Sequence, residues 1–164
     1  MTRMNLHAKY VSHLPAVVDA LRHTTGEVLE LGAGLSTFVL HWLCGQQGRT
    51  ALTCETSEYY YEMVQHCACN WHTLCLIEDW DSAPIDRRWS VALIDHAPAE
   101  RRRVEVGRLA DLATVIIVHD CESRQAHHYS YGDLLDTFRY RRNYGLDGRL
   151  TVMVSNFEDV TLWT

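Results

Sequence analysis

The sequence predicts one α/β domain, residues 1–164, built on a doubly wound and mostly parallel β-sheet. Short apolar runs alternate with stretches of helical periodicity, which is the pattern of strands separated by helices. The run at 114–118 is entirely β-branched, as in a strand that helices cover on both faces. A glycine turn, Gly32-Ala33-Gly34, follows the first apolar strand and precedes a helical pattern. A chain of 164 residues has room for one well-buried domain of ordinary size.

The first half of the chain supplies the beginning of this alternation. Residues 1–11 have no clear pattern, and Ser12 is placed to cap a helix in which Leu14, Val17 and Leu21 recur at helical spacing. The following elements are predicted, in order, as a strand at 27–31, a helix at 36–44, a strand at 50–54 and a helix from 56 or 57 to about 70.

The second half completes the sheet. We expect strands at 73–77, 90–94 and 114–118, with a helix from Pro98 to about 110 and a long polar loop at 121–131. A short helix at 134–138 then leads to two runs, 139–144 and 150–155, joined by Gly145-Leu146-Asp147-Gly148. Such a turn predicts an antiparallel hairpin, which brings the sheet to seven strands.

Composition narrows the class of protein. The net charge of −6 lacks the basic surface that a sequence-independent grip on nucleic acid requires, so nucleic acid is disfavoured as a partner. The first residues have no apolar signal segment and no run is long enough to span a membrane, so we expect a cytoplasmic protein without a membrane partner. In that compartment the six cysteines are expected as reduced thiols.

The glycine turn lies in the segment Glu30-Leu31-Gly32-Ala33-Gly34-Leu35-Ser36. Glycines at Gly32 and Gly34 allow positive φ and a close approach of the backbone to a ligand. The helix that follows offers free N–H groups and a positive dipole end to an anion. An acidic residue two positions before the first glycine makes this segment resemble the class I S-adenosylmethionine-dependent methyltransferases, which have a Rossmann-like fold. The resemblance extends over nearly the whole chain, because that fold also ends in an antiparallel pair.

The resemblance implies a binding role for each residue of the segment. Glu30 would accept hydrogen bonds from the ammonium group of the cofactor, and Gly32 and Gly34 would line it. Ser36 stands where the family has its third glycine, so Ser36 and Thr37 would offer hydroxyls to the methionine carboxylate. Two alternatives stay open: an ordinary turn between strand and helix, and a dinucleotide site, for which Thr37 stands where a glycine is needed.

Carboxylates recur at the strand ends, where open parallel sheets bind ligands. The series consists of Glu30, Glu55, Asp79, Asp95 and Asp120. Glu55 is spaced to accept hydrogen bonds from ribose hydroxyls, a feature that nicotinamide enzymes share. The resemblance implies that Asp79 binds the adenine amino group and that Trp80 covers the ring. The alternative for Asp79 is a turn-forming aspartate.

Two further dipeptides, Asp95-His96 and His119-Asp120, are expected to face each other where a methyl acceptor would lie. They resemble the catechol O-methyltransferase type, in which Asp-His and Asp-Asn segments hold a divalent cation. The chain departs from that type at Pro98, where the type has a lysine base, and at Cys121, where it has an asparagine. No metal is therefore predicted, although His96, His119 and Glu122 would suit a softer ion.

The acceptor-side residues are predicted to be Asp95, His119 and Asp120. His119, or His96, would take a proton from the acceptor, since imidazole titrates near neutral pH. The alternative is a buried histidine satisfied by the backbone. The 121–131 loop and the first ten residues are expected to choose the acceptor, with His127, His128, Tyr129 and Tyr131 forming a lid.

Two other clusters have mainly structural interpretations. The segment from His66 to Cys75 contains two histidines and three cysteines, but its spacing does not match structural zinc sites, so core thiols are favoured. In the run Arg101-Arg102-Arg103 one side chain could point to the site and bind an anion, while such runs are more often solvated.

The sequence therefore predicts an S-adenosylmethionine-dependent methyltransferase that acts on an oxygen or nitrogen of a small molecule. One rival is a protein that binds the cofactor or its demethylated product without turnover, and a weaker one is an NAD(P)-dependent oxidoreductase. The sequence leaves the acceptor and the oligomeric state open.

Overall fold

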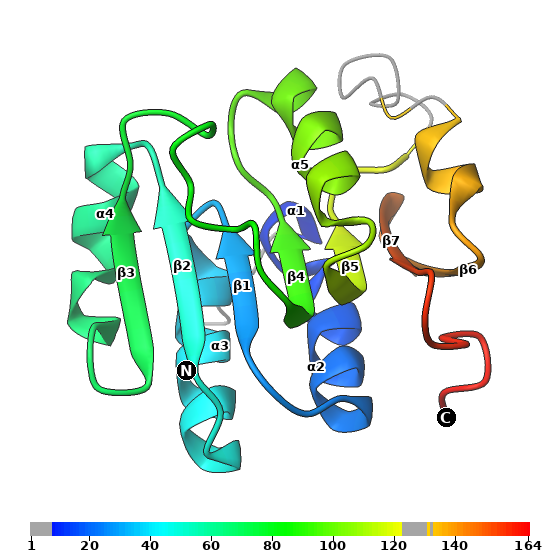
Figure 1. The fold of residues 1–164 in the computed structure, drawn as a ribbon, viewed down its shortest axis with the longest axis horizontal. Coiled ribbons are helices and arrows are strands. Elements are labelled where there is room, and N and C mark those ends of the chain that lie inside the picture. Colours follow the sequence, from blue (N-terminus) through cyan, green and yellow to red (C-terminus); the bar gives the residue numbers. More distant parts are fainter. Residues whose placement is uncertain (1–7, 123–130, 132) are drawn as a thin grey trace.

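The computed structural model describes residues 8–122, 131 and 133–164. Its strands form one seven-stranded sheet in the order β3-β2-β1-β4-β5-β7-β6 (Figure 1). The strands are β1 (Val28–Leu31), β2 (Ala51–Glu55), β3 (His72–Leu76), β4 (Trp89–Ile94), β5 (Ala113–Val118), β6 (Tyr140–Leu146) and β7 (Arg149–Ser155). The α-helices are α1 (Ala8–Val11), α2 (Leu14–His23), α3 (Leu35–Gln47), α4 (Glu58–Val64) and α5 (Arg102–Leu109). Short 3-10 turns lie at Gln65–Cys67, Ala99–Arg101 and Leu134–Thr137.

The first five strands are parallel, and β7 inserts antiparallel between β5 and β6. This is the predicted doubly wound sheet with its C-terminal hairpin, and the prediction is confirmed. The strand order reverses between β1 and β4, where Leu31 pairs with Ile94 on one side and with Cys54 on the other. Open α/β sheets bind ligands at the carboxyl ends of the strands at such a reversal.

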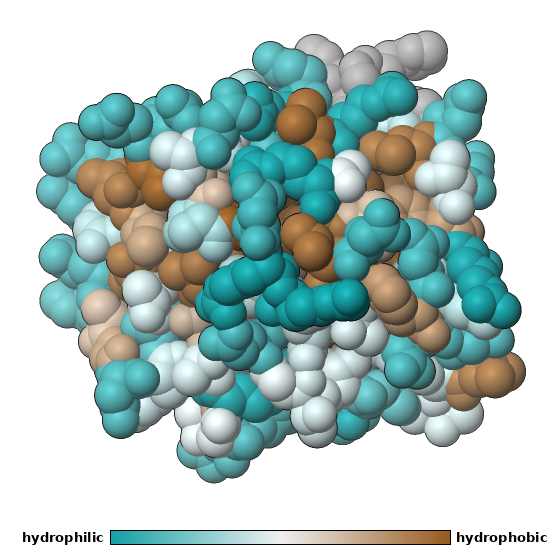
Figure 2. Space-filling view, viewed as in Figure 1, coloured by the Kyte–Doolittle hydropathy of each residue, from teal (hydrophilic) through white to brown (hydrophobic). Residues whose placement is uncertain are grey.

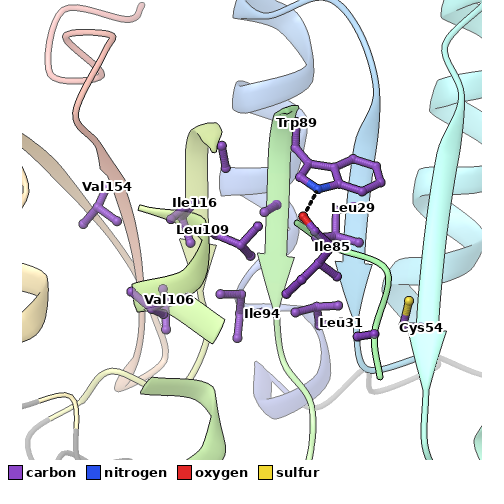
Figure 3. Packing of buried hydrophobic residues seen from close by; sticks show 14 of the residues in the cluster. Leu29, Leu31, Cys54, Ile85, Trp89, Ile94, Val106, Leu109, Ile116 and Val154 are labelled. Carbon is purple, nitrogen blue, oxygen red and sulfur yellow. Dashed lines mark hydrogen bonds between the residues drawn. The ribbon is translucent and has the colours of Figure 1, made fainter. Parts of the chain in front are cut away.

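Both faces of the sheet are buried because alternate strand residues point to opposite sides. Val28 and Val91 pack against α2 and α3, while Leu29 and Ala92 pack under α5 and the 77–88 segment. Figure 3 shows the core on the α5 face of the sheet, in which the Trp89 indole N–H donates to the carbonyl of Ile85 at 2.8 Å. On the outside, Figure 2 shows hydrophilic and hydrophobic residues interspersed over the face that Figure 1 displays. The apolar residues of the central strands are buried, while the edge strands β3 and β6 expose Leu76 and Leu146.

The hairpin turn is tighter than the sequence pattern suggested. β6 and β7 extend to Leu146 and Arg149, so only Asp147 and Gly148 form the turn. Their φ values of 48° and 78° are both positive, as a two-residue turn of type I′ requires. Asp and Gly are residues that tolerate this backbone.

Several helix boundaries differ from the predicted ones. The helix expected to reach about residue 70 ends at Val64 and continues only as a 3-10 turn, because the chain folds back so that the Cys69 N–H donates to the His72 carbonyl. α1 was not expected, since four residues are too few to show periodicity. Ser12 does not cap α2, whose N-cap residue is His13. Among the described residues no helix has the length and apolarity to cross a membrane.

Candidate functional site

The glycine turn after β1 lies at the carboxyl edge of the sheet, beside the strand-order reversal. Gly32 has a φ of 98°, and a Cβ there would lie 2.7 Å from the backbone nitrogen of His96. Its N–H donates to the Cys54 carbonyl at 2.9 Å. Only glycine fits, because the strain and the clash with main-chain atoms add together. The close approach that the sequence predicted is here an approach to the end of β4.

Gly34 differs from the prediction in its backbone. Its φ of 177° is extended, so the positive φ that the sequence analysis allowed at both glycines is found only at Gly32. A Cβ at Gly34 would meet no atom within 4 Å. The turn therefore has one side packed on the protein at Gly32 and one open side at Gly34, next to the N-terminus of α3.

Glu55, at the end of β2, fixes this turn in place. Its Oε2 accepts from the Ala33 N–H at 2.8 Å, and its Oε1 accepts from the N–H groups of Thr56 and Ser57, both at 2.7 Å. One carboxylate thus joins the glycine turn to the start of α4. Each carboxylate oxygen has two lone-pair directions, so Oε1 is fully used and Oε2 keeps capacity for one of the ribose hydroxyls that the sequence assigned to Glu55.

Glu30 lies beneath the turn, with 1% of its surface exposed. Its Oε2 accepts from Thr37 Oγ1 at 2.8 Å and from Thr53 Oγ1 at 2.7 Å. Burial raises the pKa of this carboxyl to about 7, although hydrogen bonds from Ser36, Thr53 and Thr37 oppose the shift. Its Oε1 has no hydrogen-bond partner among the described side chains and backbone.

Thr37 and Ser36, which were expected to bind the cofactor, face the interior of the protein instead. The Thr37 hydroxyl points inward to Glu30 and accepts from the Gly34 N–H at 2.9 Å, so it braces the turn instead of facing outward. Ser36 is also buried. Glu30, Ser36 and Thr37 form the floor of the site, while Gly34 and the first N–H groups of α3 form its open surface.

Asp79 and Trp80 follow β3 and differ in burial. Asp79 is exposed, and its Oδ1 accepts from the Ser82 N–H at 2.8 Å, which is the turn-forming alternative. Trp80 is buried; its ring stacks on His96 with centroids 4.0 Å apart and its Nε1–H donates to the Ala97 carbonyl at 2.7 Å. In this structure Trp80 therefore covers His96 and not an open pocket.

The predicted acceptor-side residues meet at the tips of β4 and β5. Nδ1 of His119 lies 2.9 Å from Oδ1 of Asp95, and Nε2 lies 2.8 Å from the Ser12 hydroxyl. His119 is 2% exposed. Burial disfavours its charged form, but the hydrogen bond and charge of Asp95 and the charge of Asp120 prevail, so the pKa of His119 is raised.

The pKa of Asp95 is shifted in the opposite direction, downward. Burial alone would raise the pKa of the Asp95 carboxyl, but the hydrogen bond and charge of His119 and the charge of Arg102 lower it. Its side chain is 23% exposed, the most open of the three predicted acceptor-side residues. The pair is thus set up with the proton on His119 Nδ1, because an ionised carboxylate only accepts.

Arg102 is the member of the arginine run that points into the site. Its Nη2 lies 2.9 Å from Asp95 Oδ1 and its Nη1 lies 3.6 Å from Asp120 Oδ2. Asp120 has a φ of 56°, a backbone strain that an aspartate tolerates. This guanidinium already neutralises the carboxylate pair that holds a divalent cation in the catechol O-methyltransferase type. The residues present therefore do not fit a magnesium site between Asp95 and Asp120, since that ion requires a shell of oxygen ligands.

Ser12 and His13 were missed as site residues. They lie at the start of α2, 107 positions from His119 in the case of Ser12. Nothing in the local sequence pattern indicates that the N-terminal segment folds over the tip of β5. The His13 ring contacts the His119 ring edge-on with centroids 4.7 Å apart. Desolvation lowers the pKa of His13 to about 4, although the charge of Asp95 opposes this.

The remaining candidates lie elsewhere or outside the described residues. His96 points away from His119, with Nε2 3.3 Å from Oε2 of the buried Glu105. All six cysteines are in the described segments and none forms a disulfide. Among the described residues, the segment from His66 to Cys75 holds no group of three or more side chains placed to share a metal ion. The lid residues at 127–129 and the first seven residues lie outside the described part. Tyr131 is buried and donates to the His119 carbonyl at 3.2 Å.

Comparison with solved structures identifies the fold. The methyltransferase domain of METTL16 superposes with a TM-score of 0.65 at 9% identity, covering 89% of this chain and 82% of that one. A putative O-methyltransferase from Klebsiella pneumoniae gives 0.64 at 13% identity, with 95% and 84% covered. The O-methyltransferase TomG from Streptomyces achromogenes, solved in complex with S-adenosylmethionine, gives 0.64 at 14% identity, with 88% and 78% covered. Neither a family model nor a curated protein sequence matches the chain.

The chain therefore has the fold of the class I S-adenosylmethionine-dependent methyltransferases, as the sequence predicted. At 9–14% identity these likenesses carry the fold and not the reaction.

Proposed function

We propose that this protein binds S-adenosylmethionine at the glycine turn and transfers its methyl group to an oxygen or nitrogen of a small molecule. The observation that carries the proposal is the open side of Gly34 beside Glu55, at the strand-order reversal of a methyltransferase fold. TomG, which shares the fold, was solved with this cofactor. The acidic net charge of −6 favours a small acceptor over nucleic acid.

Each part of the turn has a role in this proposal. The N–H groups at the start of α3 and the open side of Gly34 receive the amino-acid part of the cofactor, since a helix N-terminus attracts a carboxylate. Glu55 accepts from a ribose hydroxyl through Oε2, and the exposed Asp79 accepts from the adenine amino group. Glu30 and Thr37 hold the turn from below. Trp80 acts by holding Ala97 and His96 in place.

The bound cofactor supplies a methyl group on a sulfonium, and the protein's main task is to align the acceptor with it. Asp95, His119 and Asp120 border the acceptor in this proposal. Asp95 fixes the His119 tautomer, which leaves Nε2 as the basic atom. Because Nε2 contacts the Ser12 hydroxyl, an acceptor must displace Ser12 or pass its proton through it.

One observation favours the rival function, binding without turnover. His119 is almost fully buried, and both of its ring nitrogens have hydrogen-bond partners within the protein. A binder would use the same glycine turn and need no base. Turnover therefore has to be measured separately from binding.

Calorimetry with Gly34→Val tests the binding step. A Cβ at Gly34 meets no protein atom within 4 Å, so the variant should fold normally and lose S-adenosylmethionine affinity by roughly tenfold or more, because the branched side chain fills the approach. Gly107→Ala in α5, where a Cβ also meets nothing, is the matched control and should bind as the wild type does. Binding of NAD in place of S-adenosylmethionine would overturn the proposal.

Turnover is measured as S-adenosylhomocysteine release with a panel of small hydroxyl and amine acceptors. Acceptor-dependent product that His119→Gln lowers supports the transferase. Tight cofactor binding with no acceptor consumed across the panel supports the binder.

A further inference from the structure

His13 is a buried imidazole whose ring nitrogens make no hydrogen bond with the described residues. Only 3% of the residue is exposed. Buried polar atoms in folded proteins are nearly always paired, so two unpaired nitrogens on one ring point to a ligand. The ring contacts the imidazole of His119 edge-on, with centroids 4.7 Å apart.

His13 lies in a group of three side chains with metal-ligating atoms. One such atom from each of His13, Asp95 and His119 lies within 4.8 Å of the others. Atoms that share an ion lie about 3–4 Å apart when each is about 2.1 Å from it. A small rotation of the rings and the carboxylate would bring the three ligand atoms to that separation.

We propose that His13, Asp95 and His119 bind a divalent transition-metal ion, with Zn²⁺ as the physiological class of ligand. Two imidazoles and one carboxylate are a donor set that suits zinc and its neighbours and leaves a coordination position open. The set differs from the oxygen site expected between the strand-end aspartates, because two of its ligands are imidazoles and one comes from the N-terminal segment.

The surrounding charge tolerates such an ion. Asp95 Oδ1 lies 2.9 Å from Arg102 Nη2 and 2.9 Å from His119 Nδ1, so the carboxylate would bind the ion through Oδ2. Arg102 brings positive charge close to the group, and Asp120, which lies 3.6 Å from both Arg102 Nη1 and His119 Nδ1 and 3.5 Å from Arg149 Nη1, offsets part of that charge. Ligation replaces one of the two hydrogen bonds of His119.

The proposal goes beyond methyl transfer and does not depend on it. A histidine nitrogen that binds an ion cannot accept a proton, so an occupied site would remove His119 from use as a base. Because ion binding is measured without cofactor or acceptor, its failure and the failure of the proposed methyltransferase are distinguishable.

Titration of Co²⁺ into the tag-free, chelator-treated full chain tests the site. Bound Co²⁺ reports its ligands by visible absorption, and Zn²⁺ should displace it in calorimetry. We expect one ion per chain, and a loss of affinity on the order of 100-fold in His13→Ala, since even outer-shell changes cost 10–100-fold. His23→Ala, at the other end of α2, is the matched control and should bind as the wild type does.

A thermal measurement covers the case in which His13→Ala folds poorly. Zn²⁺ should raise the Tm of the wild type and of His23→Ala, but not that of the milder variant His13→Asn. The proposal is overturned if the wild type binds neither ion, if the His13 variants bind as the wild type does, or if Co²⁺ shows the charge-transfer band of thiolate ligands, which would place the ion on cysteines.

Discussion

Nδ1 of His119 lies 2.9 Å from Oδ1 of Asp95, although the two residues are 24 positions apart and follow different strands. The contact exists because β4 and β5 are parallel neighbours, so the residues after Ile94 and Val118 reach the same edge of the sheet. It couples the proton affinities of the two side chains.

Asp95→Asn should lower the pKa of His119. The hydrogen bond and the charge of Asp95 are what hold that pKa above its usual value against desolvation, and the amide supplies neither the charge nor a stronger acceptor. The pKa is measured from the imidazole resonances during an NMR titration of chelator-treated protein. Asp120→Asn, which removes a weaker contact at 3.6 Å, should have a smaller effect. An unchanged His119 titration in Asp95→Asn would show that the pair does not form in solution.

Glu30 makes stability fall as pH rises. Its pKa is about 7 in the folded protein against a usual value of 4.5, so between these values the folded state holds a proton that the unfolded state has lost. The free energy of unfolding should therefore decrease across this window, by roughly 3 kcal/mol from this group. Glu30→Gln should flatten that part of the profile, as measured by urea unfolding at several pH values.

The control for this prediction is Glu62→Gln, which changes an exposed carboxyl of α4. It should leave the slope between the two pH values as in the wild type. An equally steep profile in Glu30→Gln would assign the slope to another group.

The sequence predicted the fold well because its main signal is local. The alternation of apolar runs and helical periodicity sets the strands in order, and the turn at Gly145–Gly148 sets the hairpin. The helix after Ser57 ends earlier than predicted because the chain folds back at Cys69–His72 to start β3, which pairs with the distant β2 through contacts such as the Ala51 N–H with the Trp71 carbonyl. Such contacts leave no trace in a window of neighbouring residues.

The candidate site was predictable only in part, for the same reason. Carboxyl ends of parallel strands share an edge, so the sequence could bring Glu55, Asp95 and Asp120 to one side of the sheet. It could not show that Thr37 turns inward, that Trp80 is buried on His96, or that the segment before α2 lies over β5. Those orientations depend on packing between elements far apart in the chain.

Gly32 and Gly34 should respond differently to the same substitution. Gly32→Ala combines a φ of 98° with a Cβ 2.7 Å from backbone atoms of His96, which cannot move aside without shifting β4. The variant should lose roughly 2 kcal/mol of unfolding free energy or more. Gly34→Ala should lose much less, since its φ is extended and its Cβ position is open. Chemical denaturation of the two variants measures the difference, and equal losses would contradict the asymmetric packing of the turn.

Ser12→Ala should destabilise the protein through His119. The Ser12 hydroxyl is the partner of Nε2 at 2.8 Å, and both side chains are buried. Removing the hydroxyl leaves a buried ring nitrogen without a partner, which costs about 1–3 kcal/mol. Ser12→Thr keeps the hydroxyl and adds a methyl group, so it separates loss of the hydrogen bond from simple crowding. Urea unfolding near neutral pH measures both variants. If Ser12→Ala is as stable as the wild type while Ser12→Thr is not, the hydroxyl contributes nothing and the site tolerates an open Nε2, which would also make His119 directly accessible as a base.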